Sequence, residues 1–147
     1  MAQDCGDANL SQRFADLIAD ARSDELEPFL KEQPENFILI EDLALTNMGL
    51  GDKVAAFALA QQAMAAVPIE KDALDGPASI EILARVAARL EEPARAIVAL
   101  RKLLSVPYEG ALTSGTPLTP ALLRLDPMFD TLRSDPRFQE LCKDKQP

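Results

Sequence analysis

The chain of 147 residues has no histidine, no tryptophan and a single tyrosine, and its two cysteines lie near opposite ends. Histidine is the commonest general acid or base, and a nucleophilic cysteine needs a neighbouring base, so these absences argue against an enzyme. Cys5 and Cys142 lack the close spacing of zinc or redox sites. We therefore expect free thiols in a reducing, cytoplasmic compartment, and no catalytic residue, metal or cofactor.

Long apolar runs and an excess of basic residues are also missing. No stretch approaches the ~20 apolar residues that span a bilayer, and the first ten residues do not resemble a signal peptide. The net charge is -9: residues 1–75 hold 15 acids and 5 bases, whereas residues 76–147 hold 9 acids and 10 bases. Because phosphate backbones are bound by basic residues, we expect no nucleic acid and no membrane partner. The acidic half is compatible with a basic partner or with a solvated surface.

What the chain does contain is helical periodicity. Hydrophobic residues make up 48% of the sequence, and few of them are aromatic, which favours a core of aliphatic and small side chains. Apolar residues recur at spacings of three and four, and no segment shows the alternation of a strand. The sequence therefore predicts an all-α fold, with helices over residues 11–22, 23–33, 35–48, 53–67, 77–90 and 93–105.

Two of the predicted helix pairs repeat one another. Small or aliphatic residues of the pair 35–67 recur 40 positions later in the pair 77–105. Small side chains at matched positions let the two helices of a pair approach closely, which is a physical reason to repeat them. The matched positions are Ile40, Leu43, Ala44, Ala56 and Ala60, followed by Ile80, Leu83, Ala84, Ala96 and Leu100.

At these residues the sequence resembles the tetratricopeptide repeat family, whose unit is ~34 residues long. The resemblance implies antiparallel hairpins stacked as a right-handed superhelix, in which the first helix of each pair lines an inner groove. A protein or peptide segment, or a neighbouring domain, would bind there. The residues expected to face that groove are Ile38, Glu41, Leu45, Met48, Glu81, Arg85 and Arg89.

Two of these residues carry a more specific hypothesis. Arg85 and Arg89 are one helical turn apart and could present paired donors to a partner's carboxylate. The alternative is that they form surface ion pairs with Glu81 and Glu92 and bind nothing. The family's clamp of lysines and asparagines for a peptide carboxylate is not reproduced in this sequence.

The last third of the chain contains three proline-led starts, Thr119-Pro120, Asp126-Pro127 and Asp135-Pro136. A side-chain oxygen at the position before a helix accepts unpaired N–H groups, and proline suits the first helical position. We therefore predict three short helices that cover the last hairpin, rather than an acidic cluster with catalytic or metal-binding chemistry. This divides the chain into a disordered or extended terminus at residues 1–10, helical hairpins at 11–107 and a loop with a short-helix capping segment at 108–147.

Residues 68–142, which include LRLDP and LRSDPRF, also resemble the C-terminal tetratricopeptide region of bacterial multidomain signalling proteins such as serine/threonine protein kinases. The resemblance implies an accessory module beside an output domain, and the kinase motifs themselves are not in this sequence. Three hypotheses follow. The first is a non-enzymatic protein-interaction or regulatory module. The second is a small-molecule or lipid sensor, with its ligand between the hairpins near Tyr108 and the loop 110–116. The third is a self-association module that forms homo-oligomers.

Overall fold

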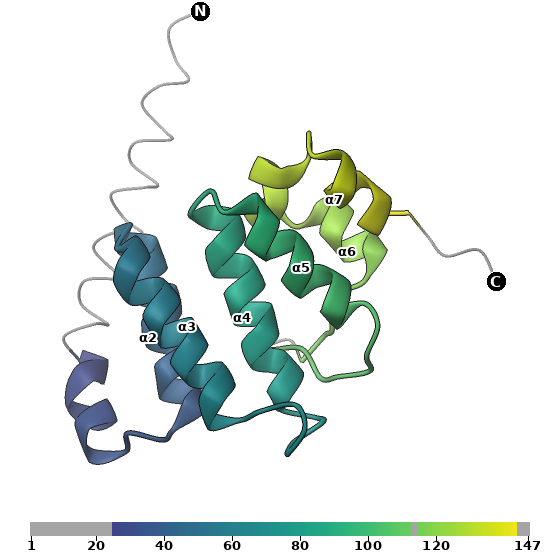
Figure 1. Cartoon of the computed structure of the whole chain (residues 1–147). Helices are drawn as coiled ribbons and strands as arrows, with labels where there is room; N and C mark the ends of the chain where they lie inside the picture. Colours follow the sequence, from purple (N-terminus) through teal and green to yellow (C-terminus); the bar gives the residue numbers. More distant parts are fainter. Residues whose placement is uncertain (1–24, 113–114, 144–147) are drawn as a thin grey trace, which may run out of the picture.

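The computed structural model describes residues 25–112 and 115–143, and all regular structure within these ranges is helical. The all-α prediction is confirmed for this part of the chain. Residues 25–32 form a helical segment that precedes the first complete hairpin (Figure 1). The predicted helix over residues 11–22 lies outside the described residues. The remaining helices are α2 (Phe37–Leu50), α3 (Lys53–Ala66), α4 (Gly76–Arg89), α5 (Pro93–Leu103), α6 (Pro120–Leu125), η1 (Pro127–Leu132) and α7 (Pro136–Leu141).

The hairpin of α2 and α3 is defined by its capping residues. The Asn36 side chain accepts a hydrogen bond from the Leu39 N–H at the start of α2. Gly51 ends α2 with φ of 78°, a left-handed conformation that favours glycine. The Asp52 carboxylate then caps α3 by accepting from the Ala55 N–H at 3.0 Å. Gly51 and Asp52 therefore form the turn between the two helices, and Gly49 lies inside α2.

A connector leads from α3 to the second hairpin, α4 and α5. Within it the Asp72 carboxylate accepts hydrogen bonds from the N–H groups of Leu74 and Asp75. Gly76 begins α4 directly against the connector, where a Cβ atom would lie 2.7 Å from the Ile69 Cα. Glycine is therefore needed here for a close approach of backbone to backbone.

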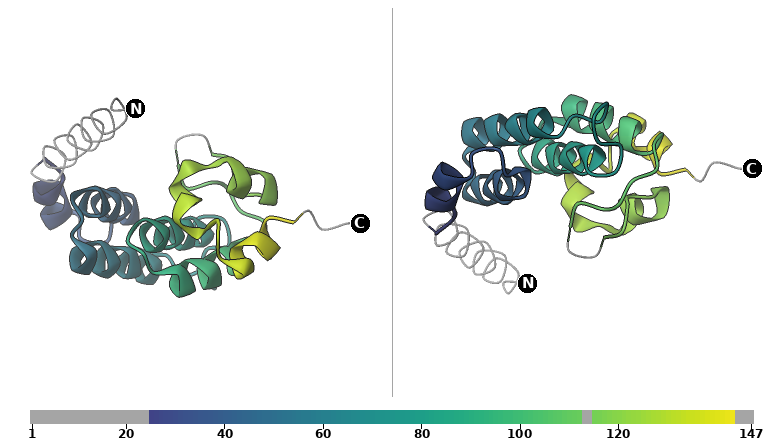
Figure 2. Two further views of the ribbon diagram at one scale, coloured as in Figure 1. Left: turned by 90° about the horizontal axis from the view of Figure 1, so that it is seen from above. Right: turned by 90° about the horizontal axis from the view of Figure 1, so that it is seen from below.

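The two hairpins lie side by side, and α4 is the central helix of the structure (Figure 2). It contacts α2, α3, α5 and η1, and most of its residues are buried. The repeated small residues lie in these contacts with no exposed surface, as the close approach of the helices requires. They are Ala44, Ala56, Ala84 and Ala96.

Enlarging one of these residues is expected to destabilise the fold. Ala84 is fully buried, so a leucine in its place would overpack the helix contacts and cost about 1–3 kcal/mol. Urea denaturation measures the change in the free energy of unfolding. Ala65→Leu, on the exposed side of α3, is the matched control and is expected to change little. An equal effect of the two substitutions would contradict close helix packing at Ala84.

The three proline-led starts all begin helices, as predicted. The side chains of Thr119, Asp126 and Asp135 accept hydrogen bonds from the N–H groups of Leu122, Met128 and Arg137. The second of the three is a 3-10 helix, a form that proteins use in short pieces such as this. Asp126 and Asp135 therefore begin helices, and the carboxylate of Asp130 pairs with Arg133 at 2.6 Å.

These short helices cover the second hairpin, as the capping prediction requires. Helix η1 contacts α4, and α7 contacts α5. Phe129 and Phe138 are both buried, with ring centroids 6.1 Å apart. The Thr131 hydroxyl also donates to the Ala88 carbonyl of α4 at 2.8 Å, which ties η1 to the end of that helix. In the part of the chain that the structure describes, no helix is long and apolar enough to cross a membrane.

Candidate partner-binding surfaces

The seven residues predicted to face an inner groove lie on α2 and α4, and their environments differ. Ile38 is 57% exposed, and Arg89 is also exposed. Leu45 and Met48 are half-buried and pack against the core. The other three, Glu41, Glu81 and Arg85, are buried charged residues. The predicted groove residues on α2 are thus partly accessible, except for Glu41, whereas Glu81 and Arg85 on α4 are covered.

Glu41 links the two first helices of the hairpins. Its Oε1 atom accepts a hydrogen bond from the Ser79 hydroxyl of α4 at 2.6 Å. Burial raises the pKa of Glu41 to about 7, although the hydrogen bond from Ser79 acts in the opposite direction. The carboxyl group therefore changes its charge near neutral pH, at the contact between α2 and α4.

The raised pKa predicts that Glu41 makes the fold less stable as pH rises. In the unfolded chain Glu41 has an ordinary pKa of 4.5, so the folded state binds more protons between pH 4.5 and about 7. The stabilisation is complete below pH 4.5 and is lost as pH rises through 7. The Glu41→Gln variant keeps an acceptor for Ser79. We expect its free energy of unfolding, relative to that of the wild type, to be higher at pH 8 than at pH 5.

Urea denaturation of the wild type and the Glu41→Gln variant at both pH values measures this difference. Other groups titrate in the same pH range, but their contributions to the free energy of unfolding cancel when the two proteins are compared. A wild-type minus variant difference that stays constant between pH 5 and pH 8 would exclude a raised pKa at Glu41.

Glu81 is the centre of a buried polar network. Its carboxylate accepts from the Arg85 guanidinium at 2.8 and 2.9 Å, within α4. It also accepts from the Tyr108 hydroxyl at 2.8 Å and from the Ala111 N–H at 3.2 Å, both in the segment after α5. Since Glu81 is only 1% exposed, these donors replace the water that a carboxylate would otherwise bind. The network holds the chain after α5 against α4.

Arg85 extends this network to the capping segment. Its guanidinium pairs with the Asp126 carboxylate at 2.8 Å and lies over the Phe129 ring, 5.5 Å from the centroid. Arg85 is 5% exposed, so it is covered by the protein's own acids and aromatic ring. The expected pair with Glu81 forms, but in the interior rather than on the surface, and Glu92 pairs with Lys53 instead.

The described residues near Tyr108, considered above as part of a ligand site, contact one another. The Tyr108 hydroxyl accepts from the Leu118 N–H at 2.8 Å in addition to donating to Glu81. Burial raises the pKa of Tyr108, so the phenol stays protonated at neutral pH. A Cβ atom on Gly110 would lie 2.1 Å from the Thr116 carbonyl oxygen. The two sides of this loop are therefore in close contact.

An open groove does lie between the hairpins. Its walls are formed by the second helices of the two pairs, α3 and α5, and its floor by α4. Its volume is about 650 Å³. Val98, at its centre on α5, is 68% exposed, and the Arg95 guanidinium at its edge lies 4.7 Å from the centroid of the Phe57 ring. We call this surface the α3–α5 groove. Its lining residues are Gln61, Met64, Ile80, Leu83, Ala94, Arg95, Val98, Ala99 and Lys102.

Sequence reasoning did not find the α3–α5 groove, although one signal was present. Arg95, Val98 and Lys102 are spaced by three and four residues and so share one face of α5. That face of α5 therefore carries an exposed apolar side chain, Val98, between two cations. The family resemblance pointed instead to the first helices of the pairs.

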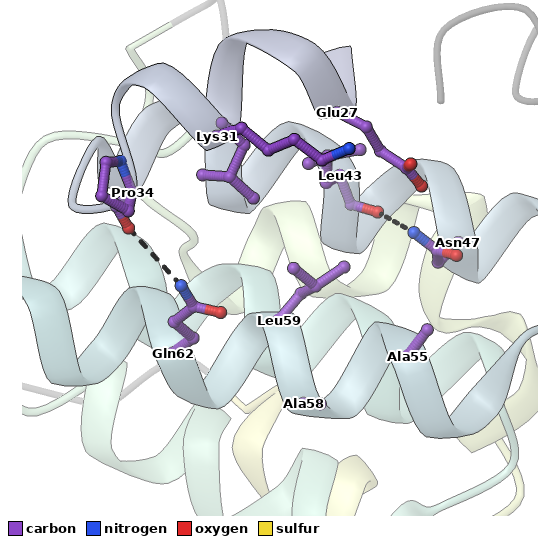
Figure 3. A pocket seen from close by; sticks show the side chains of 10 residues that line it. Glu27, Lys31, Pro34, Leu43, Asn47, Ala55, Ala58, Leu59 and Gln62 are labelled. Atoms are coloured by element: carbon purple, nitrogen blue, oxygen red, sulfur yellow. Dashed lines mark hydrogen bonds between the residues drawn. The ribbon is translucent and has the colours of Figure 1, made fainter. Parts of the chain in front are cut away.

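A second pocket, of about 520 Å³, lies on the other side of α3 (Figure 3). It is bounded by the helical segment 25–32, α2 and α3, and its apolar lining includes Leu30, Leu43 and Leu59. Two of its polar side chains are used within the fold: Gln62 donates to the Pro34 carbonyl, and Asn47 donates to the Leu43 carbonyl. The pocket is thus a gap where segment 25–32 meets the first hairpin.

Comparisons with protein-family models, with curated proteins and with solved structures found no match to this chain. The class is therefore defined by the described residues themselves: an all-α protein with two complete helical hairpins and a capping segment of short helices. Within these residues, no group of three or more Asp, Glu, Cys or His side chains is placed to hold a metal ion.

Proposed function

We propose that this chain is a non-enzymatic module of the tetratricopeptide type that binds a protein segment or a neighbouring domain. The observation that carries the proposal is the α3–α5 groove, an apolar surface between two hairpins that the described residues leave uncovered. Contiguous exposed apolar patches rimmed by polar residues are a common feature of protein interaction sites and ligand-binding grooves. The central exposed residue, Val98, belongs to no internal packing cluster of the described core.

The capping segment supports the same proposal from the other end of the stack. A repeat array needs an end that shields its terminal apolar face, and α6, η1 and α7 supply one beside α4 and α5. The capped second hairpin leaves other surfaces open, among them the α3–α5 groove and the exposed part of α2 around Ile38. We place such a module beside an output domain of a bacterial signalling protein, as the resemblance of residues 68–142 implies.

Site-specific photo-crosslinking tests this proposal in the source cells. A photoreactive residue at Val98 should give a reproducible adduct with one protein or with a neighbouring domain. Position 38 tests the inner face in the same way. Leu74, which is 64% exposed on the connector, is the matched control and should give none. If positions 98 and 38 yield no more adduct than position 74, the interaction function is excluded.

A small-molecule sensor is the second candidate, and the size of the groove favours it. Ligand pockets typically have volumes of about 300–1,000 Å³ and combine apolar lining with a few polar groups. The α3–α5 groove meets both criteria, with Arg95 and Lys102 as the charged groups, so an amphipathic anion is the matching ligand class. Thermal-shift screening should then identify a metabolite that raises the melting temperature of the wild type but not of Val98→Asp.

A further inference from the structure

The charges of the α3–α5 groove are all of one sign. Among its nine lining residues, the only charged side chains are the cations Arg95 and Lys102. Val98 lies three residues after the first cation and four before the second, so all three side chains share one face of α5. The two cations are about 10 Å apart along the helix, at ~1.5 Å per residue. This face therefore has an exposed apolar centre with a cation at each end.

The helical segment 25–32 has the same pattern with the opposite charges. Phe29 is 55% exposed, and the exposed acids Glu25 and Glu32 lie four residues before it and three after it. At about 3.6 residues per turn, these three side chains lie within roughly 60° of one another around the helix. Lys31, the segment's cation, is on the other side and lines the pocket against the first hairpin. The exposed face of the segment is therefore an aromatic ring with an acid at each end.

The two patterns match when the two helices run antiparallel. If Phe29 is placed opposite Val98, then Glu25, four residues before the ring, lies opposite Lys102, four residues after the valine. The second acid of the segment then lies opposite the second cation of the groove, three residues from the apolar centre on each helix. The two acids have the same separation as the two cations, so both ion pairs can form in one register.

Both cations are able to bind a carboxylate from outside the chain. Lys102 is exposed. The Arg95 guanidinium lies over the Phe57 ring, which has no oxygen to accept from its N–H groups. Glu92, about one helical turn before Arg95, forms an ion pair with Lys53. The N–H groups of the two cations can therefore donate to the acids of a docked helix.

The apolar part of the groove suits an aromatic ring. Its volume is about 650 Å³, and its lining includes Met64, Ile80 and Leu83 beside the exposed Val98. Aromatic side chains bury more apolar area than aliphatic ones, and a methionine sulfur makes favourable contacts with an aromatic ring. The groove thus has a place for a phenylalanine between its two cations.

We infer that the α3–α5 groove of one copy binds the helical segment 25–32 of a second copy, through Phe29 and its two flanking acids. This inference rests on the proposed interaction function and names the partner. The uneven charge of the chain fits the same contact, since residues 1–75 carry an excess of acids and residues 76–147 a slight excess of bases. The contact joins one surface from each half.

The position of segment 25–32 requires that the contact join two copies. The segment packs on the side of α3 that carries Leu59, whereas the groove lies on the side that carries Met64. Figure 2 shows the segment beside the first hairpin, on the side away from α5. Because the groove and the segment are different surfaces, each copy can give one segment and receive another. Association therefore continues until a ring closes.

Sedimentation velocity of the full chain, over a concentration series up to about 1 mM, tests the inference. The wild type should self-associate, and the association should weaken with added salt because the ion pairs are screened. Phe29→Asp and Val98→Asp should each weaken it by about tenfold or more. Ile38→Asp, the same kind of change on the exposed face of α2, should leave it unaffected. Circular dichroism melts verify that each variant retains the fold.

A charge exchange tests the register of the contact. Lys102→Glu places an acid opposite Glu25 and should weaken self-association. Adding Glu25→Lys to the same chain restores an ion pair of reversed polarity, so the double variant should associate like the wild type. The matched control is Lys102→Glu with Glu27→Lys, which has the same net charge. Glu27 lines the pocket on the other side of the segment, so this control should not recover association.

Three results would overturn the inference: a wild type that stays monomeric over the whole series, association that survives both Phe29→Asp and Val98→Asp, or a charge exchange that rescues no better with Glu25→Lys than with Glu27→Lys. The proposed interaction function would still stand if a crosslinker at position 98 captures a different protein or a neighbouring domain. Failure of both experiments would exclude the interaction function as well.

Discussion

Arg85→Ala is expected to destabilise the fold by about 3–5 kcal/mol, the cost of breaking a buried ion pair by removing one partner. Glu81 is 1% exposed in the wild type, and the substitution leaves its carboxylate with the Tyr108 hydroxyl and the Ala111 N–H as donors. It also removes the partner of Asp126 and the cation over the Phe129 ring. Chemical denaturation followed by circular dichroism measures the loss.

The matched control is Arg137→Ala, which breaks the ion pair with Asp135 at the protein surface. Arg137 is half-exposed in that pair, and exposed ion pairs contribute about 0–1 kcal/mol. A double variant, Glu81→Gln with Arg85→Met, removes both charges and should recover part of the stability lost in Arg85→Ala. If Arg85→Ala costs no more than Arg137→Ala, the network does not hold the capping segment in the way the structure indicates.

Phe129→Ala is expected to cost about 3–5 kcal/mol, as for other large aromatic residues removed from a core. Phe129 has no exposed surface, and it contacts both Phe138 of α7 and the guanidinium of Arg85. Its removal therefore separates the capping helices from the second hairpin. Hydrogen exchange should show faster exchange first in α6, η1 and α7, and in α4 where Ala88 accepts from Thr131.

Phe29→Ala is the control for the loss of an aromatic ring. Phe29 lies in segment 25–32 and is 55% exposed, so its removal should change the free energy of unfolding by well under 1 kcal/mol. Equal effects of the two phenylalanine substitutions would show that the capping helices are not packed on the second hairpin.

Helix ends were the most predictable part of the fold, because each is decided by a few neighbouring residues. Gly51 and Asp52 end one helix and begin the next, and the Asp-Pro and Thr-Pro pairs begin the three short helices. Predicted and observed bounds differ by about two residues: the helix predicted over 35–48, for example, spans Phe37–Leu50. Such differences are expected, since capping groups compete over adjacent positions.

The candidate site was much less predictable. The spacing of Glu81 and Arg85 indicated that they share a helix face, and they do form an ion pair. Their burial depends on Tyr108 and Asp126, which are 27 and 41 residues away from their respective partners. No local pattern specifies contacts over such separations. The α3–α5 groove was missed for the same reason, since its two walls belong to different hairpins.

The sequence by itself determined that this protein is helical in its described part, where its helices begin and end, and which small residues lie between them. These features follow from hydrogen bonding and side-chain size within a few residues of each position. Only the tertiary structure decided that Glu81 and Arg85 are internal and that the α3–α5 groove is open. The burial of Glu81 and Arg85 depends on which segment packs over α4. The residues that make this contact are far apart in the chain.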